Sequence, residues 1–118
     1  MSEKTRIALR EEPSLVIIDI AGEVTTFAED AIMGAYREAT QRGADRILVN
    51  FAQVDYINSA GVAVMIGLLA EARQRDQHIM VSGLTPHYTK VFDMMGLARY
   101  IRIFDNEEDA KRSVQAGS

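Results

Sequence analysis

The sequence predicts a single α/β domain with a mainly parallel sheet, one antiparallel edge strand and about four helices. Three observations support this fold class. Short runs rich in β-branched residues alternate with longer segments of helical periodicity, in the order β-β-α-β-α-β-α-β-α. A length of 118 residues suits one hydrophobic core, so we expect residues 1–118 to form one domain. The chain also contains no internal repeat and no Gly/Ser/Pro-rich linker.

The first two strands are predicted as an antiparallel hairpin. Thr5–Arg10 alternates in polarity, and Glu11–Ser14 is a charged turn that contains a proline. Leu15–Ile20 is a continuous β-branched run, which is typical of a strand buried deeper in the sheet.

A first helix is predicted over Phe27–Arg42. Thr26 and Glu29 fit a capping box, and Gly43 suits the left-handed residue that ends a helix. Arg46–Phe51 then forms an interior strand. The expected inner face of the helix consists of Phe27, Ala31, Ile32, Ala35, Tyr36 and Ala39.

The second half continues the alternation of strands and helices. Thr85 before Pro86 is a strong helix start, Gly96 suits the end of that helix, and Asp105 is expected to cap the last one. The expected elements are a loop at Gln53–Asn58, a helix at Ala60–Arg75, a strand at Gln77–Ser82, a helix to about Met95, a strand at Arg99–Phe104 and a helix ending near Gln115.

Composition excludes several classes of function. The chain has 13 Lys+Arg against 17 Asp+Glu and a net charge of −4, which argues against nucleic acid or an anionic membrane surface as a partner. It has no cysteine and two histidines, so we expect no metal site and no cofactor. The N-terminus lacks the apolar core of a signal peptide, and the longest uncharged run, Asn58–Ala70, is too short to span a bilayer. We therefore expect a cytoplasmic protein.

Known catalytic patterns are missing from the sequence. There is no phosphate-binding loop, dinucleotide fingerprint or nucleophile elbow. His78 and His87 have no carboxylate at a spacing that would form an acid–base pair, so we interpret both as surface or capping residues. A small nucleotide-binding or hydrolytic enzyme is accordingly the weakest hypothesis, and we expect no catalysis.

The most informative stretch is Val54–Met65, where a buried strand leads through polar residues to an apolar helix. It places Ser59 at the carboxyl end of a strand, where ligand and partner sites gather in α/β sheets. A phosphate on Ser59 is compatible with a helix N-terminus. In the alternative interpretation, Ser59 is only an N-cap and Gly61 only permits close packing. The apolar helix and the segment Phe92–Leu97 likewise suit either core packing or a partner surface.

These residues resemble the STAS domain family, named for sulfate transporters and anti-sigma factor antagonists. The similarity is greatest to free-standing bacterial anti-sigma factor antagonists and extends over about 110 residues. The motifs that carry it are Ala21–Val24, Ile47–Phe51, Ile57–Gly61, Met80–Pro86 and Val91–Leu97.

The resemblance implies a partner-switching role. In such antagonists the serine at the position of Ser59 is phosphorylated by a kinase that is also the anti-sigma factor, and phosphorylation breaks their complex. The residues expected to bind the partner are Glu23, Thr25, Thr26, Tyr56, Asn58, Ser59, Ala60, Gly61 and Met65. Three of these positions depart from the usual pattern, because Asn58 and Thr25 replace acidic residues and Ala60 replaces a second hydroxyl residue.

The same family resemblance leaves a second role open. STAS proteins also act as scaffold or regulatory subunits of larger signalling or membrane transport complexes. A homodimer or a larger STAS assembly is compatible with either role.

Overall fold

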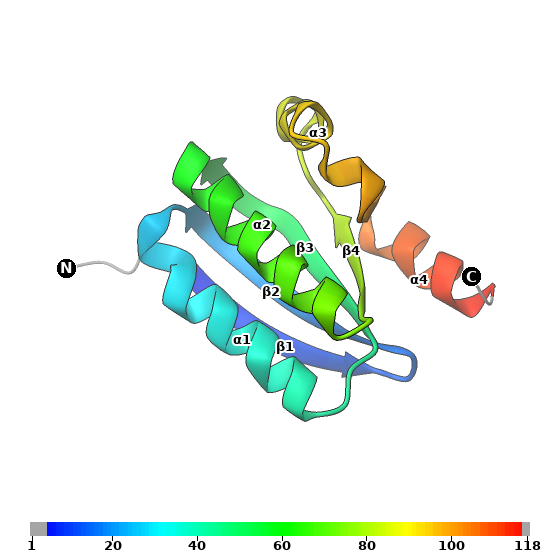
Figure 1. The fold of residues 1–118 in the computed structure, drawn as a ribbon. Helices are drawn as coiled ribbons and strands as arrows, with labels where there is room; N and C mark the ends of the chain where they lie inside the picture. Colours follow the sequence, from blue (N-terminus) through cyan, green and yellow to red (C-terminus); the bar gives the residue numbers. More distant parts are fainter. Residues whose placement is uncertain (1–4, 117–118) are drawn as a thin grey trace.

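Five strands form one sheet in the order β1-β2-β3-β4-β5, and four helices pack on its two faces (Figure 1). The computed structural model describes residues 5–116. The strands are β1 (Thr5–Glu12), β2 (Leu15–Val24), β3 (Arg46–Ile57), β4 (His78–Ser82) and β5 (Arg102–Phe104). The α-helices are α1 (Glu29–Gln41), α2 (Ser59–Gln74), α3 (Pro86–Met94) and α4 (Glu107–Gln115), and the 3₁₀ turns are η1 (Thr26–Ala28) and η2 (Leu97–Arg99).

The strand pairing confirms the predicted α/β class. β1 is antiparallel to β2 and lies at one edge of the sheet, whereas β2, β3, β4 and β5 are mutually parallel. The element order, with its antiparallel edge and four α-helices, is the predicted one.

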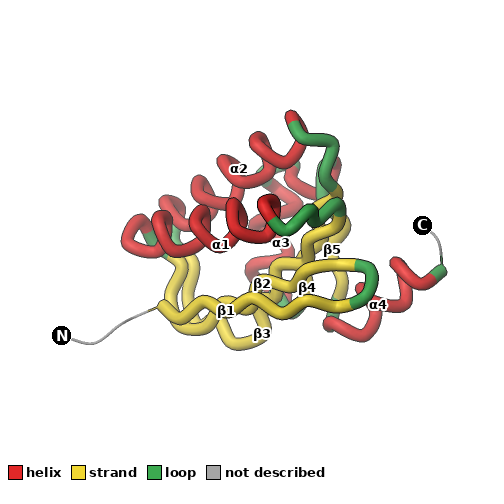
Figure 2. The backbone as a smooth tube through the Cα atoms, turned by 90° about the horizontal axis from the view of Figure 1, so that it is seen from below, coloured by secondary structure: helices red, strands yellow, loops and turns green. Residues whose placement is uncertain are grey.

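The two faces of the sheet are covered unequally. Figure 2 shows α1, α2 and α3 on one face and α4 on the other. The first face holds the larger core, in which the rings of Phe51 and Phe92 meet edge to face with centroids 5.9 Å apart. The second face holds a small apolar cluster, Leu15, Ile17, Leu48, Met80, Ala110 and Val114.

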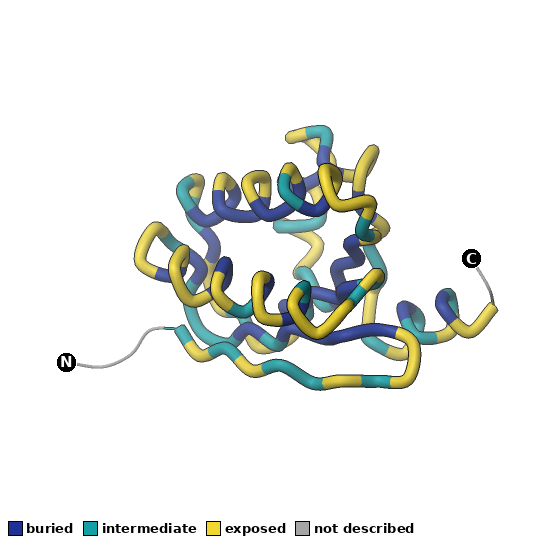
Figure 3. Tube along the Cα trace, turned by 60° about the horizontal axis from the view of Figure 1, so that its bottom comes forward, coloured by how far each residue is buried: buried dark blue, intermediate teal, exposed yellow. Residues whose placement is uncertain are grey.

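The helix after β2 keeps part of its predicted inner face, because Ile32, Tyr36 and Ala39 are buried as predicted, whereas Ala31 is exposed. The turn η1 precedes α1, so the inward positions are Ala28, Ile32, Tyr36 and Ala39, with Met33 beside them. Phe27 was predicted on the inner face, and this is wrong, because Ala28 takes the inward place and leaves Phe27 exposed. The sides of α1 and α2 that face the sheet are buried along their length in Figure 3.

Helix boundaries follow the local signals with some corrections. The capping box predicted at Thr26 and Glu29 is wrong, because Thr25 caps η1 and Ala28 precedes α1 without a side-chain cap. Thr85 accepts a hydrogen bond from the Tyr88 amide, as expected of the cap before Pro86, and both Gly43 and Gly96 have the predicted positive φ. The cap of α4 is Asn106, not Asp105. The strand predicted at Arg99–Phe104 is shorter, because its first residue belongs to η2 and pairing with β4 begins only at Arg102.

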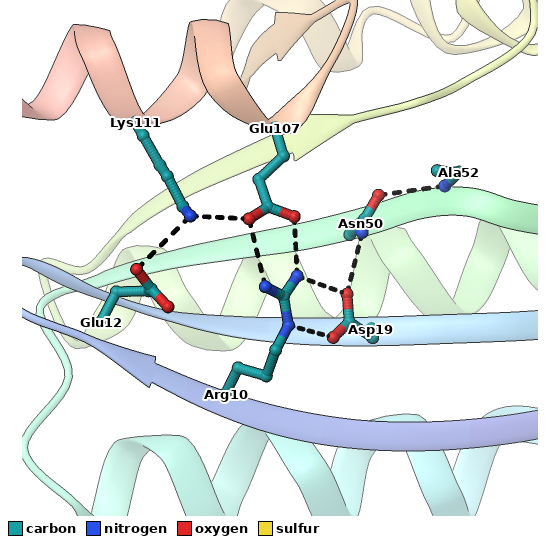
Figure 4. Close-up of polar contacts among 7 residues, drawn as sticks. All are labelled: Arg10, Glu12, Asp19, Asn50, Ala52, Glu107 and Lys111. Carbon is teal, nitrogen blue, oxygen red and sulfur yellow. Dashed lines mark hydrogen bonds and ion pairs between the residues drawn. The ribbon is translucent and has the colours of Figure 1, made fainter.

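A network of charges attaches α4 to the sheet (Figure 4). Arg10 on β1 bonds to Asp19 on β2 at 2.5 Å and to Glu107 on α4 at 2.7 Å. Lys111 bridges Glu107 and Glu12. The hydrogen bonds from Arg10, followed by those from Lys111, lower the pKa of Glu107 to about 2.

The Asp19 carboxylate belongs to the same network. It also accepts a hydrogen bond from Asn50 on β3 at 2.8 Å. The Arg10 hydrogen bond lowers the pKa of Asp19 in the same way as that of Glu107. Strands β1, β2 and β3 are therefore all tied to α4 through charged and polar side chains.

Candidate functional site

The strands β2 and β3 continue beyond β4 and β5 and build the platform of the candidate site. The last pair between β3 and β4 is Asn50 with Ser82, but β2 and β3 remain paired as far as Val24 and Ile57. The predicted loop at Gln53–Asn58 is wrong, since all but its last residue belong to β3. The extension carries the chain to the start of α2.

A close backbone contact fixes the start of α2 on this platform. The Asn58 amide donates to the Val24 carbonyl at 3.2 Å. A Cβ on Gly61 would lie 2.0 Å from that same carbonyl oxygen and 3.1 Å from Ile57 Cγ2, so only glycine fits there. Gly61 therefore permits close packing, as the sequence analysis proposed for this glycine.

Asn58, and not Ser59, caps α2. The Asn58 Oδ1 atom accepts the Gly61 amide at 2.8 Å, and its extended backbone (φ −99°, ψ −179°) is usual for an N-cap. Ser59 is the first helical residue. Its hydroxyl is exposed and has no hydrogen-bond partner within residues 5–116. The interpretation of Ser59 as a cap is thus wrong, and the hydroxyl is accessible.

The segment after Val24 lies beside the same helix end. Thr25 is the extended cap residue of η1, and its hydroxyl accepts the Phe27 amide at 3.2 Å. The turn packs against α2, and Ala28 is completely buried beneath it. Phe27 is 93% exposed. We refer to Glu23–Phe27 together with Tyr56–Gly61 as the Ser59 edge.

Two further contacts hold the Ser59 edge in place. The Tyr88 hydroxyl of α3 accepts the Ile57 amide at 3.0 Å, and the Thr5 hydroxyl of β1 donates to the Glu23 carbonyl at 2.6 Å. Sequence reasoning missed Tyr88, because nothing in its local pattern indicates a bond to a strand 31 residues earlier. These contacts link the edge to β1 and α3.

The predicted partner-binding residues fall into two groups. Most meet at the Ser59 edge, where Glu23 pairs with Tyr56 across β2 and β3, and Tyr56 is 47% exposed. Met65 does not join them, because it is 2% exposed and packs in the core. The residues that meet at the edge are Glu23, Thr25, Thr26, Tyr56, Asn58, Ser59, Ala60 and Gly61, of which Gly61 is buried against Val24.

An uncharged stripe continues from Ser59 along the outer side of α2. The helix buries its inner residues, including Val62 and Leu68, against the sheet and its neighbours. The exposed positions carry no charge until Arg73, and Ile66 is the largest of them. They are Ser59, Ala63, Ile66, Gly67 and Ala70. The helix was expected to form either core or partner surface, and it supplies both kinds of position.

An apolar groove borders this stripe between α2 and the segment after α3 that includes η2. Ile66 and Ala70 line one side, and Met95, Leu97 and Tyr100 line the other. In the Phe92–Leu97 segment Phe92 is buried, whereas Met94 and Met95 are exposed. The segment therefore also divides between core and surface.

Neither a cluster of metal-ligating side chains nor a membrane-spanning helix is found among the described residues. No three His, Asp or Glu side chains between Thr5 and Ala116 are grouped to hold a metal ion. Within that same span, none of the helices has both the length and the hydropathy required to cross a bilayer.

Comparisons with known proteins agree on one family. The model of the STAS domain matches residues 6–110. The chain is 24% identical over 114 residues to an anti-sigma F factor antagonist of Paenibacillus polymyxa, covering 96% of this chain and 97% of that one.

Solved structures of an antagonist show the same fold. The anti-sigma factor antagonist SpoIIAA in its unphosphorylated form is similar with a TM-score of 0.74 and 21% identity, over 96% of this chain and all of that one. The Bacillus cell fate determinant SpoIIAA in the phosphorylated form has a TM-score of 0.70 and 24% identity, over 92% of this chain and 99% of that one.

Proposed function

The chain belongs to the STAS domain family, and from that premise we propose that it is an anti-sigma factor antagonist. It binds an anti-sigma factor that is also a serine kinase, and phosphorylation of Ser59 by that kinase releases it. The observation that carries this proposal is the accessible, unpartnered Ser59 hydroxyl on the rigid first turn of α2. The similarity to anti-sigma factor antagonists supports it, and one similar protein, SpoIIAA, is known in a phosphorylated form.

The surroundings of Ser59 suit both states of such a switch. A phosphate adds about −1.5 to −2 charges at pH 7. The N-terminal end of α2 tolerates this charge, because the helix dipole is positive there, so the fold survives phosphorylation. A partner that has covered the uncharged outer stripe of α2 must instead desolvate the new charge. Phosphorylation therefore weakens docking without unfolding the protein.

The proposed role requires no catalysis by this chain. The partner supplies ATP and the transfer chemistry, and this chain supplies an acceptor hydroxyl and a docking surface. We expect the exchange to take place in the cytoplasm, with no metal or cofactor bound to the antagonist.

The test is the affinity of the purified kinase for three forms of the chain, measured by calorimetry with ADP present. We expect Ser59→Ala to bind within about twofold of the wild type, because Ser59 does not cap the helix. Ser59→Asp should bind at least tenfold more weakly, because it places a charge on the docking surface. Equal affinity for all three forms would contradict the switch. Incorporation of all three forms into a large STAS assembly would favour the scaffold role.

A further inference from the structure

The Phe27 side chain is the most exposed large apolar group among the described residues. Its exposed fraction is 93%, compared with 76% for Met94 and 54% for Met95. Soluble domains expose single apolar residues routinely, so exposure alone has little meaning. The meaning comes from how this phenylalanine is held and from what lies beside it.

Phe27 sits at the centre of a one-turn scaffold that is fixed at both ends. The Thr25 hydroxyl accepts the Phe27 amide, and the Thr25 carbonyl accepts the Ala28 amide at 3.0 Å. Val24 before the turn and Ala28 after it are both completely buried. The backbone that carries Phe27 is therefore ordered before any partner arrives, which lowers the entropy lost on binding.

The scaffold is part of the same structure that presents Ser59. The Val24 carbonyl accepts the Asn58 amide and lies against Gly61, and η1 packs on α2. Any partner that covers Ser59 meets a protein surface that includes this turn. Tyr56, about half exposed, belongs to the same edge.

We propose that Phe27 is the anchor by which the partner kinase recognises this antagonist, inserting into an apolar pocket of the kinase. This rests on the proposed function, since the kinase is the occupant of the Ser59 edge. A rigid aromatic side chain that fills a partner pocket is the usual form of an interface hot spot. The uncharged surroundings on α2 fit the same kind of apolar contact.

Phe27 acts by positioning and takes no part in phosphate transfer. Its loss should therefore weaken docking and raise the KM of the antagonist as a kinase substrate, with kcat nearly unchanged. A side chain with a merely structural role would instead lower the thermal stability of the free chain. A highly exposed side chain contributes little to that stability.

The experiment compares Phe27→Ala, Phe27→Leu and Met94→Ala with the wild type. Met94→Ala is the matched control, because it removes another highly exposed apolar side chain that lies outside the Ser59 edge and is not among the residues lining the groove beside α2. Calorimetry with the purified kinase measures affinity, and steady-state phosphorylation measures kcat and KM. We expect Phe27→Ala to weaken binding about 10- to 30-fold and to raise KM in proportion. Phe27→Leu should restore part of the loss, Met94→Ala should stay within twofold, and all melting temperatures should be unchanged.

The outcomes distinguish a failure of the Phe27 anchor from a failure of the proposed antagonist function. If the kinase binds and phosphorylates the wild type, and Phe27→Ala does both equally well, the anchor is wrong and the proposed function stands. An equal loss in Met94→Ala would also overturn the anchor, since the effect would not be specific to Phe27. If the kinase neither binds nor phosphorylates the wild type, the proposed function and the anchor fail together.

Discussion

The two places where α4 and α2 meet the sheet differ in what joins them. At α4, charged side chains carry the contact: Arg10 lies between Asp19 and Glu107, and Lys111 closes the network (Figure 4). At the start of α2, the contact is made by backbone atoms of Val24, Asn58 and Gly61. The first region satisfies its polar groups internally, and the second leaves a hydroxyl and an aromatic ring exposed.

This difference separates a structural attachment from a docking surface. In the α4 network each charge has an opposite charge within hydrogen-bond distance, so little remains for a partner to bind. At the Ser59 edge the backbone is held by main-chain contacts and by the side chains of Thr25, Asn58 and Tyr88, while the Phe27 and Ser59 side chains are free to meet a partner. A surface that is rigid in its backbone and unsatisfied in its side chains suits recognition. The predictions below test each half of this contrast.

The largest effect is expected at Gly61. Gly61→Ala places a Cβ within 2.0 Å of the Val24 carbonyl oxygen, and backbone has to move to relieve the clash. We expect a loss of about 3 kcal/mol in the free energy of unfolding. The matching loss in melting temperature is roughly 10 °C or more.

The matched control is Gly67→Ala in the same helix, where a new Cβ meets nothing within 4 Å. Because alanine favours the helix, this variant should gain about 0.5–1 kcal/mol. Calorimetric melting of both variants measures the difference. If the two variants had the same melting temperature, the close contact between Gly61 and the Val24 carbonyl would not contribute to stability.

A smaller effect, which depends on pH, is expected at Arg10. The pKa of Glu107 is about 2 in the folded protein, against an ordinary value of 4.5. A lowered carboxyl pKa contributes stability that is fully present above about pH 4.5 and is lost as the pH falls toward 2. Because the side chains are partly exposed, we expect Arg10→Met to cost about 1 kcal/mol at pH 7.

Urea unfolding at pH 7 and at pH 3 measures this contribution. The gap between wild type and Arg10→Met should narrow at the lower pH, where part of the Glu107 contribution has already been lost. Arg37→Met, which breaks a surface ion pair with Glu71, serves as the control and should show a smaller loss at both pH values. A pH-independent gap for Arg10→Met would show that the charge network is not what holds α4.

The smallest expected effect is the difference in stability between the variants Asn58→Ala and Ser59→Ala. Asn58→Ala removes the side chain that accepts the Gly61 amide and should cost about 1 kcal/mol. Ser59→Ala removes an exposed hydroxyl with no cap role and should change stability by less than about 0.5 kcal/mol. Thermal unfolding of the two variants side by side gives the comparison. If Ser59→Ala lost more stability than Asn58→Ala, Ser59 would be the cap of α2, and its hydroxyl would not be free to accept a phosphate.

Local signals predicted most of the fold. The β-branched runs Leu15–Ile20 and Arg46–Phe51 form the first parts of β2 and β3, and the Thr85-Pro86 start and the Gly43 and Gly96 ends hold in the structure. Such signals depend on a few neighbouring residues, so the sequence alone reveals them.

The parts that sequence reasoning missed depend on distant contacts. Gln53–Ile57 is polar enough to resemble a loop, and it becomes strand because β2 supplies a partner for it. Phe27 fits a helical inner face by spacing, but in the turn η1 it is Ala28 that is buried. Of the residues predicted for the site, the structure brings Ser59 and its neighbours together, while Met65 is buried, because burial depends on how α2 packs.

The most direct test of the central claim is the mass of the chain, and of its Ser59 peptide, after incubation with the purified kinase and ATP. We predict one phosphate per chain, located on Ser59, together with release of the kinase as followed by size-exclusion chromatography. Ser59→Ala should gain no phosphate and stay bound. Phosphate on another residue, or release of Ser59→Ala by ATP, would contradict the claim that the Ser59 edge is the switch.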